Sequence, residues 1–413
     1  MSERRFWLTQ LDARESATLV ATFSGWMLDG MDVMVYSFVL PALISLWHIT
    51  TAQAGWLGTS ALLLSSLGGW IAGLAADRWG RVRILQWTIV WFAVFTFLSG
   101  FTQSFSQLLI VRGLQGLGFG GEWAVGSVLI GERIRREFRG RAVGTTQAGW
   151  AIGWGIAAVF YTLFFKLLPE QYAWRAMFLV GILPAVLAVW IQRHVPESEV
   201  FERRRIEPPA NFMRIFSRGL LRTTLLASLV ALGAQGGYYA VNTFLPLYLN
   251  AHGLSVISTG AYLLVVIAGS FAGYITSAHL TDRIGRKGTL IVFAAGSFVA
   301  ITLYTVMPLG NAATLILGFP LGFFPSGSFS PMGSFFTELF PTALRGSGQG
   351  FSYNFGRAIG ALFPTLVGYF SVRMKLGPAI ALFSGAAYAI MVLSVLLLPE
   401  TRARSLEEVD GRG

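Results

Sequence analysis

Apolar residues run through this chain in long stretches, not in the short alternating patterns of a soluble domain. Twelve stretches approach or exceed the roughly 20 residues that a membrane-spanning helix needs. The pattern therefore predicts an all-α membrane protein with twelve transmembrane helices. The stretches lie near residues 17–47, 52–76, 83–101, 105–131, 141–168, 174–195, 219–250, 256–280, 287–308, 312–339, 345–370 and 376–399.

Composition agrees, because 54% of the 413 residues are hydrophobic and only 12% are charged. In a soluble protein, the net charge of +11 would suggest a nucleic-acid partner. With the N-terminus inside, however, 25 of the 31 Lys and Arg residues fall in inner segments and four face out. This bias places both termini in the cytoplasm and explains the charge without nucleic acid. We expect a multi-pass protein of the inner (plasma) membrane, surrounded by membrane lipids.

The two halves of the chain repeat each other. ADRWGR at Ala76 recurs as TDRIGR at Thr281 after 205 residues, and GERIRREFRG pairs with TELFPTALRG at an offset of 206. Since this offset is about half the chain, six helices are followed by six more in the same orientation. We expect an N-terminal six-helix bundle at 1–195, a charged cytoplasmic linker at 196–218, and a C-terminal six-helix bundle with a short tail at 219–413.

The repeated loops carry charged residues and glycines at matching positions. An aspartate there accepts hydrogen bonds from a helix N-terminus, and arginines pair with a glutamate or with anionic lipid. We expect the glycines to allow close helix packing. The set predicts a conformational latch that holds one closed state, with simple positive-inside anchoring as the alternative. Its members are Gly73, Asp77, Arg78, Gly80, Arg81, Glu132, Arg139, Asp282, Arg283, Gly285, Arg286, Glu338 and Arg345.

Several motifs resemble those of the major facilitator superfamily. GLAADRWGRVR from Gly73 resembles its signature loop, and RGLQGLG from Arg112 resembles its fourth-helix motif. With DGMD in the first helix, GGEW from Gly120 and FPTALRGSGQGFSYNFGRAIG from Phe340, the resemblance narrows to two branches. These are the aromatic-acid/proton symporters and the sialic acid/organic-acid proton symporters. The resemblance implies that two bundles rock around a central cavity, and we expect a monomer.

Charged residues within the predicted spans break the repeat. Asp29, for example, falls opposite Ala234 or Gln235 in the second half. A charge at a helix centre costs about 2.5 to 3.5 kcal/mol. If these charges merely held the fold, a duplicated fold would duplicate them, so function is the better explanation.

Asp29 and Asp32 share one helical face, with Tyr36 one turn further along. Burial and mutual repulsion favour the protonated form of at least one carboxyl group. We therefore assign proton coupling to Asp29, Asp32 and Glu122, and the resemblance adds Arg112. A plain hydrogen bond to a neighbouring helix is the alternative for each carboxylate, and a structural role is the alternative for Arg112.

Arg357 is the candidate for binding an anionic substrate, because a guanidinium forms bidentate bonds to a carboxylate. Its alternative is an ion pair with a first-helix aspartate. Tyr353 and Asn354 lie one turn before it. A polar stripe in the seventh helix either lines the same cavity or packs helices. The substrate-binding set is Arg357, Tyr353, Asn354, Gln235, Tyr239, Asn242 and Tyr36.

Two apparent motifs carry no chemistry. Gly116, Gly118 and Gly121 match a dinucleotide-binding pattern, but they lie in an apolar helix without a preceding strand, so they indicate helix packing. The four histidines are scattered and there is no cysteine, so we expect no metal site.

The tenth predicted helix carries Pro320, Pro325 and Pro331 among glycines and serines. Such a segment should bend, and it is a candidate gate.

These features predict a non-enzymatic, proton-coupled symporter that imports a small organic anion by alternating access. The anion would be a carboxylate such as an aromatic acid, a hydroxy acid or sialic acid, and the proton would be the coupling ion, with no other cofactor. A proton-coupled exporter and a neutral sugar uniporter are the alternatives within transport. The fifth helix lacks the Gly-Pro pair of antiporters, which disfavours export by exchange. A membrane sensor or membrane-embedded enzyme is the non-transport alternative.

Overall fold

The computed structural model describes residues 7–135, 139–197, 212–253, 256–341 and 344–401. Every regular element in these ranges is a helix. The elements are η1 (Trp7–Gln10), α1 (Ala13–Trp47), α2 (Thr51–Trp79), α3 (Arg81–Ser99), α4 (Phe105–Arg133), α5 (Arg139–Leu167), α6 (Glu170–Leu179), η2 (Val180–Ile182), α7 (Pro184–His194), η3 (Phe212–Phe216), α9 (Leu221–Asn242), α10 (Leu245–Ala251), α11 (Val256–Ile284), α12 (Arg286–Val306), α13 (Asn311–Gly327), α14 (Ser330–Leu339), α15 (Arg345–Gly360), α16 (Leu362–Met374) and α17 (Leu376–Leu397).

These elements form the twelve predicted spans, so the all-α prediction is confirmed. Single helices form eight spans, and the pairs α6/α7, α9/α10, α13/α14 and α15/α16 form the other four. Over the described residues, ten spans are long and apolar enough to cross a membrane by length and composition alone. The other two of the twelve spans are α2 and α4, which are not among these ten.

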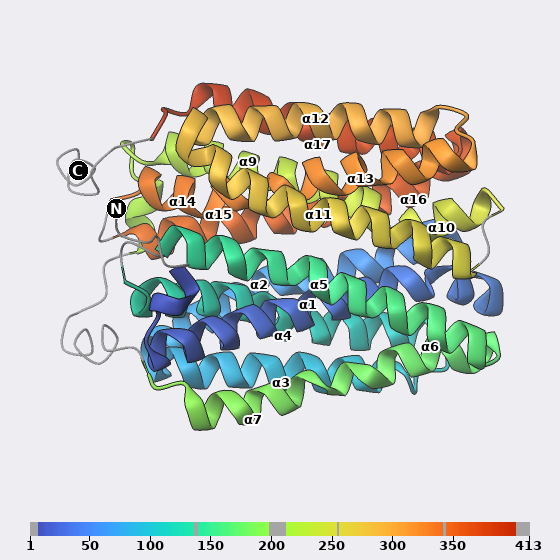
Figure 1. Ribbon diagram of the computed structural model, residues 1–413, viewed down its shortest axis with the longest axis horizontal. Coiled ribbons are helices and arrows are strands. Elements are labelled where there is room, and N and C mark those ends of the chain that lie inside the picture. The colour runs from blue at the N-terminus through green and yellow to red at the C-terminus, as the bar shows by residue number, and fades with distance from the viewer. Residues whose placement is uncertain (1–6, 136–138, 198–211, 254–255, 342–343, 402–413) are drawn as a thin grey trace.

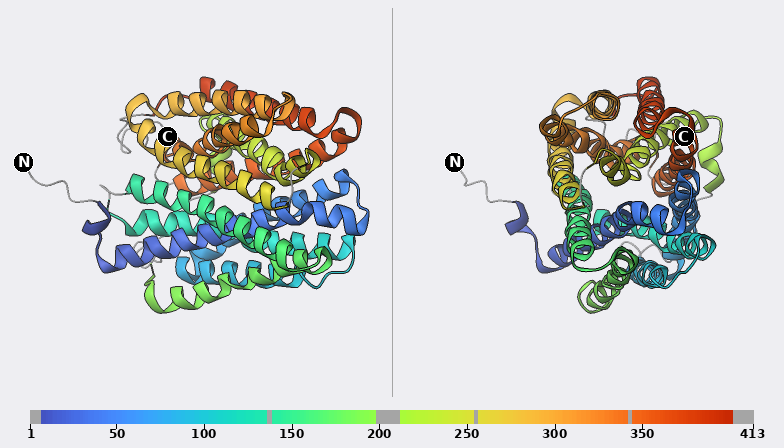
Figure 2. Two further views of the ribbon diagram at one scale, coloured as in Figure 1. Left: turned by 45° about the vertical axis from the view of Figure 1, so that its right-hand side comes forward. Right: turned by 90° about the vertical axis from the view of Figure 1, so that its right-hand side faces the viewer.

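The two halves of the chain lie side by side. Helices α1 to α7, blue to green, fill one side of the molecule, and α9 to α17, yellow-green to red, fill the other (Figures 1 and 2). The start of α1 and the end of α17 lie at the same end of the bundle, called here the terminal end (Figure 1). Its cytoplasmic location stays a prediction. The boundaries at 195 and 218 also stay predictions, since residues 198–211 lie outside the described ranges.

Helices α2 and α5 of the first half pack against α15, α16 and α11 of the second half. A Cβ at Gly55 of α2 would lie 2.7 Å from the carbonyl oxygen of Pro364 in α16. The Thr59 hydroxyl donates to the Ala361 carbonyl at 2.6 Å. Because α2 begins at the end opposite the termini, backbone contact between α2 and α16 closes the two halves together there.

The two halves also meet nearer the terminal end. The rings of Trp70 in α2 and Phe351 in α15 stack with their centroids 5.6 Å apart. Gly144 of α5 lies against Ala278 of α11, where an added Cβ would be 3.3 Å from the alanine methyl. The halves are therefore in contact on both sides of the bundle centre.

The tenth predicted span is divided into two helices, although Pro320 and Pro325 lie inside the first of them. Helix α13 ends at Gly327, and α14 begins at Ser330 with Pro331 in its first turn. Proline removes one hydrogen bond from the interior of a helix, but it suits the first turn of a new one. The same device divides the seventh span, where α10 starts with Pro246. Pro41, at the matching repeat position, lies inside the continuous helix α1.

Glycines bring the backbones of α1, α4 and α5 close to their neighbours. A Cβ at Gly30 of α1 would lie 2.7 Å from the Trp150 carbonyl oxygen of α5, and one at Gly153 would overlap the Met27 carbonyl oxygen. In α4, Gly116 packs on the backbone of Ala61. Gly118 and Gly121 contact α3, so all three α4 glycines serve helix packing, as predicted.

The contact between α1 and α5 gives a stability prediction. Gly153→Ala should destabilise the detergent-solubilised protein by about 1–3 kcal/mol, because the new Cβ would push α5 away from α1. Gly73→Ala is the matched control, since its Cβ would meet nothing within 4 Å. Alanine also favours a helix over glycine by about 1 kcal/mol, so this control should melt at an unchanged or higher temperature. Equal melting temperatures for the two variants would contradict the packing argument.

Candidate functional site

Asp32 lies between α1 and α4, at the middle of the first half. Its side chain is 1% exposed and accepts a hydrogen bond from the Gln115 amide nitrogen of α4. The guanidinium of Arg112, one turn earlier in α4, acts on it electrostatically and lies 5.0 Å from the centroid of the Tyr36 ring. The Tyr36 hydroxyl donates to the Ala54 carbonyl of α2. The predicted residues Asp32, Arg112 and Tyr36 are therefore together.

Asp29 is fully buried one turn earlier in α1, closer to the terminal end. Because α1 and α4 run antiparallel, it faces a later turn of α4, where Glu122 acts on it more strongly than Asp32 does. Arg357 of the second half also acts on Asp29 electrostatically. The first-helix aspartates thus have different partners, although they are only three residues apart. Gly30 between them brings α1 close to α5, not the two carboxyl groups close to each other.

Arg357 of α15 is 1% exposed at the boundary between the halves. Its Nε donates to the Gln235 side-chain oxygen at 3.1 Å. The guanidinium carbon lies 5.1 Å from the Phe119 ring centroid and 5.0 Å from the Tyr353 ring centroid. Its Nη1 has no hydrogen-bond partner among the described residues. A buried cation with an open donor is suited to binding an anion.

The polar residues of α9 have two different roles: one packs helices and two line a cavity. Gln235 packs helices, since its amide nitrogen donates to the Tyr353 carbonyl at 3.0 Å. Tyr239 and Asn242 instead line a cavity. Asn354, also predicted to bind substrate, lies against Gly69 of α2 and donates to the Gly350 carbonyl at 3.0 Å. The structure therefore places Asn354 at the contact between the halves, outside this cavity.

The cavity lies between the two halves and has a volume of about 20 Å³, room for about one water molecule. Arg112, Gln115 and Tyr36 line it from the first half, and Tyr239 and Asn242 line it from the second. With both ends of the bundle in contact, the structure shows a closed arrangement around it.

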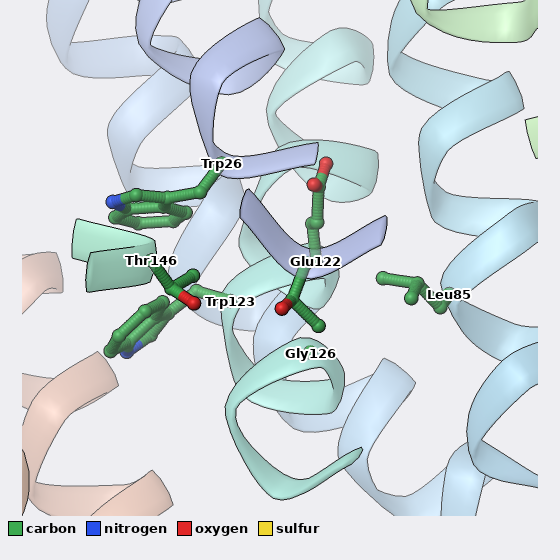
Figure 3. Close-up of a pocket in the computed structure, with 7 residues that line it drawn as sticks. Trp26, Leu85, Glu122, Trp123, Gly126 and Thr146 are labelled. Carbon is green, nitrogen blue, oxygen red and sulfur yellow. The ribbon is translucent and has the colours of Figure 1, made fainter. Parts of the chain in front are cut away.

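A cluster of tryptophans covers the terminal side of this region. The ring centroids of Trp26 and Trp123 lie 4.5 Å apart, and those of Trp26 and Trp150 lie 5.0 Å apart. Trp26, Trp123 and Glu122 line a second cavity of about 10 Å³, with the Glu122 side chain extending toward α1 (Figure 3). Sequence reasoning missed this cluster, because tryptophans on three different helices leave no local pattern.

Two predicted latch residues of the second half, Arg286 and Glu338, contact each other. Arg286 and Glu338 form a bidentate ion pair, with Nη2–Oε1 at 2.9 Å and Nε–Oε2 at 3.1 Å. The Thr401 hydroxyl donates to the same carboxylate at 2.6 Å. Glu400 accepts hydrogen bonds from the backbone nitrogens of Arg286 and Lys287 at 3.1 and 3.0 Å. These contacts join α12, α14 and the segment after α17.

The first half repeats part of this arrangement. Glu197 accepts from the backbone nitrogens of Arg81 and Val82 at 3.0 and 3.2 Å, at the start of α3. Glu197 and Glu400 are thus equivalent, each at the N-terminus of a helix, where an anion is favoured. Sequence reasoning missed both. The signal was the pair PES and PET, 203 residues apart.

The glycines of the predicted latch were expected to allow close helix packing, and the structure corrects this prediction. Gly80 and Gly285 have φ values of 105° and 88°, so glycine is needed there for the turn conformation. Gly73 faces open space, and close packing is therefore not its role. Arg283 is exposed. The side chains of six other predicted latch residues lie outside the described ones, so their roles stay predictions: Asp77, Arg78, Glu132, Arg139, Asp282 and Arg345.

The chain is similar to known transporters over almost its whole length. A family model described as Major Facilitator Superfamily matches residues 22–364. A probable 4-methylmuconolactone transporter of Cupriavidus pinatubonensis is 43% identical, over 98% of this chain and 95% of that protein. The cis,cis-muconate transport protein of Acinetobacter baylyi is 30% identical over 92% and 93%. The sialic acid transporter NanX of Escherichia coli is 29% identical over 94% and 95%.

The fold has a solved counterpart. The structure of the proton:xylose symporter XylE bound to 6-bromo-6-deoxy-D-glucose superposes with a TM-score of 0.77, covering 96% of this chain and 98% of that one. At 18% identity, this likeness concerns the fold alone. The family match, the relatives and the twelve-helix architecture agree: the chain belongs to the major facilitator superfamily and is a multi-pass inner-membrane transporter, not an enzyme.

Proposed function

We propose that this transporter imports a small organic acid as its anion, together with a proton, by alternating access. The observation that carries the proposal is the placement of Arg357 in one half opposite the carboxylates and Arg112 in the other. Three similar proteins are named for the transport of 4-methylmuconolactone, cis,cis-muconate and sialic acid, and all three compounds or their parent acids are organic acids. The coupling ion is the proton, no other cofactor is required, and the working unit is a monomer.

Arg357 is the residue proposed to hold the substrate carboxylate. Its Nε donates to the neutral Gln235 amide, and its Nη1 is unpartnered within the described part of the chain. A substrate carboxylate would supply the missing acceptor for Nη1 and a charged partner besides Asp29. A neutral sugar offers this guanidinium no charged acceptor, which disfavours the sugar uniporter.

The aromatic residues around Arg357 favour a flat, unsaturated acid. The rings of Phe119 and Tyr353 already face the guanidinium, and Trp123 lies with its ring centroid 6.0 Å from that of Tyr353. Aromatic faces attract both cations and other π systems at such distances. A conjugated carboxylate would therefore be bound at its charged end by Arg357 and along its plane by these rings.

Asp32 and Arg112 are proposed to couple proton movement to the rocking of the halves. Arg112 is 2% exposed, and its Nε and Nη1 have no hydrogen-bond partner in the described residues. When Asp32 is ionised, it balances this cation; when Asp32 is protonated, Arg112 loses its counter-charge and can reorient toward the cavity that it lines. Protonation would thus change contacts at the boundary between the halves.

Arg357→Ala should raise the dissociation constant for 4-methylmuconolactone by about 30-fold or more, because a buried charged hydrogen-bond pair contributes roughly 2–5 kcal/mol. Uptake into proteoliposomes should fall to background. Arg373→Ala is the control, since this arginine is exposed at the end of α16 and should leave uptake unchanged. Wild-type affinity in Arg357→Ala would remove Arg357 from the binding site.

Asp32→Asn should uncouple uptake from the pH gradient. The amide keeps the shape of the protonated side chain, so exchange of labelled for unlabelled substrate across the membrane should continue. Accumulation driven by an imposed inward proton gradient should be lost. The two assays are compared in the same proteoliposomes, and gradient-driven accumulation at the wild-type level would contradict the role of Asp32.

A further inference from the structure

The carboxyl groups of Asp29 and Glu122 meet between α1 and α4. The Glu122 carboxyl reaches the α1 backbone, where a Cβ at Gly25 would overlap its Oε1 and lie 3.2 Å from its carboxyl carbon (Figure 3). Gly25 and Asp29 are four residues apart on α1, and a helical side chain leans over the preceding turn. The Asp29 carboxyl therefore lies on the part of α1 that Glu122 reaches.

Three of the four oxygens of this carboxyl pair lack a hydrogen-bond donor among the described residues. Asp29 is fully buried and Glu122 is 3% exposed. Both oxygens of Asp29 and Oε2 of Glu122 have no hydrogen-bond partner in the described part of the chain. Two buried carboxylates without donors repel each other and lose their hydration. A proton on one of them removes a charge and supplies the missing donor to the other.

We propose that Asp29 and Glu122 share one proton in the substrate-free transporter, and that the pair takes up a second proton when a substrate carboxylate binds Arg357. The second step rests on the proposed function; the first does not. The second proton comes from solvent and is released to solvent with the substrate. The pair is thus a proton site separate from Asp32.

The charges around the pair support this assignment. The buried ionisable groups that act on it are Asp32 from α1, Tyr239 from α9 and Arg357 from α15. Arg112 acts on Asp32, and Tyr353 acts on Arg357, so these two groups belong to the same buried cluster. The contacts from α3 and α5 are Leu85, Thr146 and Trp150, which do not ionise. Tyrosines are neutral near pH 7.

The centre of the bundle holds three acids, two arginines and no other group that is charged near pH 7 among those named above. If Asp29, Asp32 and Glu122 were all ionised, Arg112 and Arg357 would leave one negative charge uncompensated. The shared proton cancels that charge. A substrate monoanion adds one negative charge, and the second proton on the pair cancels that charge too.

The first step is tested without substrate by infrared spectroscopy of the purified protein in lipid at pH 7. The wild type should show a C=O stretching band of a buried protonated carboxyl group. Asp29→Asn and Glu122→Gln should each remove it, because the remaining carboxylate would ionise opposite Arg357. Asp32→Asn and Glu15→Gln are the controls, and both should keep the band. Glu15 is a matched buried carboxylate, but it is ion-paired to Arg135 at 2.9 Å. Absence of the band in the wild type, or its loss only in Asp32→Asn, would overturn the shared proton.

The second step is tested by the pH dependence of 4-methylmuconolactone binding. If one proton is taken up with the anion, the wild-type dissociation constant should rise about tenfold per pH unit once the substrate-free pair no longer holds its second proton. In the double variant Asp29→Asn/Glu122→Gln, binding should lose this pH dependence, while Glu15→Gln should keep it.

If the dissociation constant of the double variant rose with pH as steeply as that of the wild type, the proposal that the pair takes up the second proton would be wrong. If wild-type protein binds neither this compound nor benzoate, the proposed substrate class is wrong, and the infrared band still decides whether the proton is shared.

Discussion

The central constraint on this molecule is that two arginines and three carboxylic acids are buried in the middle of a bundle that crosses a membrane. Charges in such a place need partners, because neither lipid nor protein can replace their hydration. Arg112 acts on Asp32, whereas Arg357 and Glu122 both act on Asp29. Close helix contacts make these placements possible, since Gly25 gives Glu122 room to reach α1 and Gly30 brings α1 onto α5.

The duplicated architecture separates the scaffold from the chemistry. Both halves use a positive-φ glycine, Gly80 or Gly285, and a glutamate at the start of the following helix to fix a loop at the terminal end. The central charges are not duplicated: the carboxylates belong to the first half, whereas Arg357 belongs to the second. Because these charged groups lie on different halves, the proposed proton steps would change the charges at the contact between the halves.

Much of the fold was predictable because membrane helices have simple requirements. A span must be long and apolar, and a proline must bend or restart it; the division between α13 and α14 followed from Pro331. Pro41 shows the limit of such rules, since it lies inside an unbroken α1 although its repeat partner Pro246 begins a new helix. Residues that act through distant partners were harder to interpret: Asn354 turned out to face α2, and the cluster of Trp26, Trp123 and Trp150 went unnoticed.

The sequence by itself determined the twelve helices, the repeat and the identity of the residues that break it, because backbone hydrogen bonds within each helix and the burial of apolar side chains in lipid are local requirements. Only the tertiary structure decided what each charged residue faces. Asp29 and Asp32 are almost equivalent in sequence, yet the antiparallel packing of α1 on α4 sets one against Glu122 and the other against Gln115 and Arg112. That difference arises from the register between two helices, which no single segment of the chain contains.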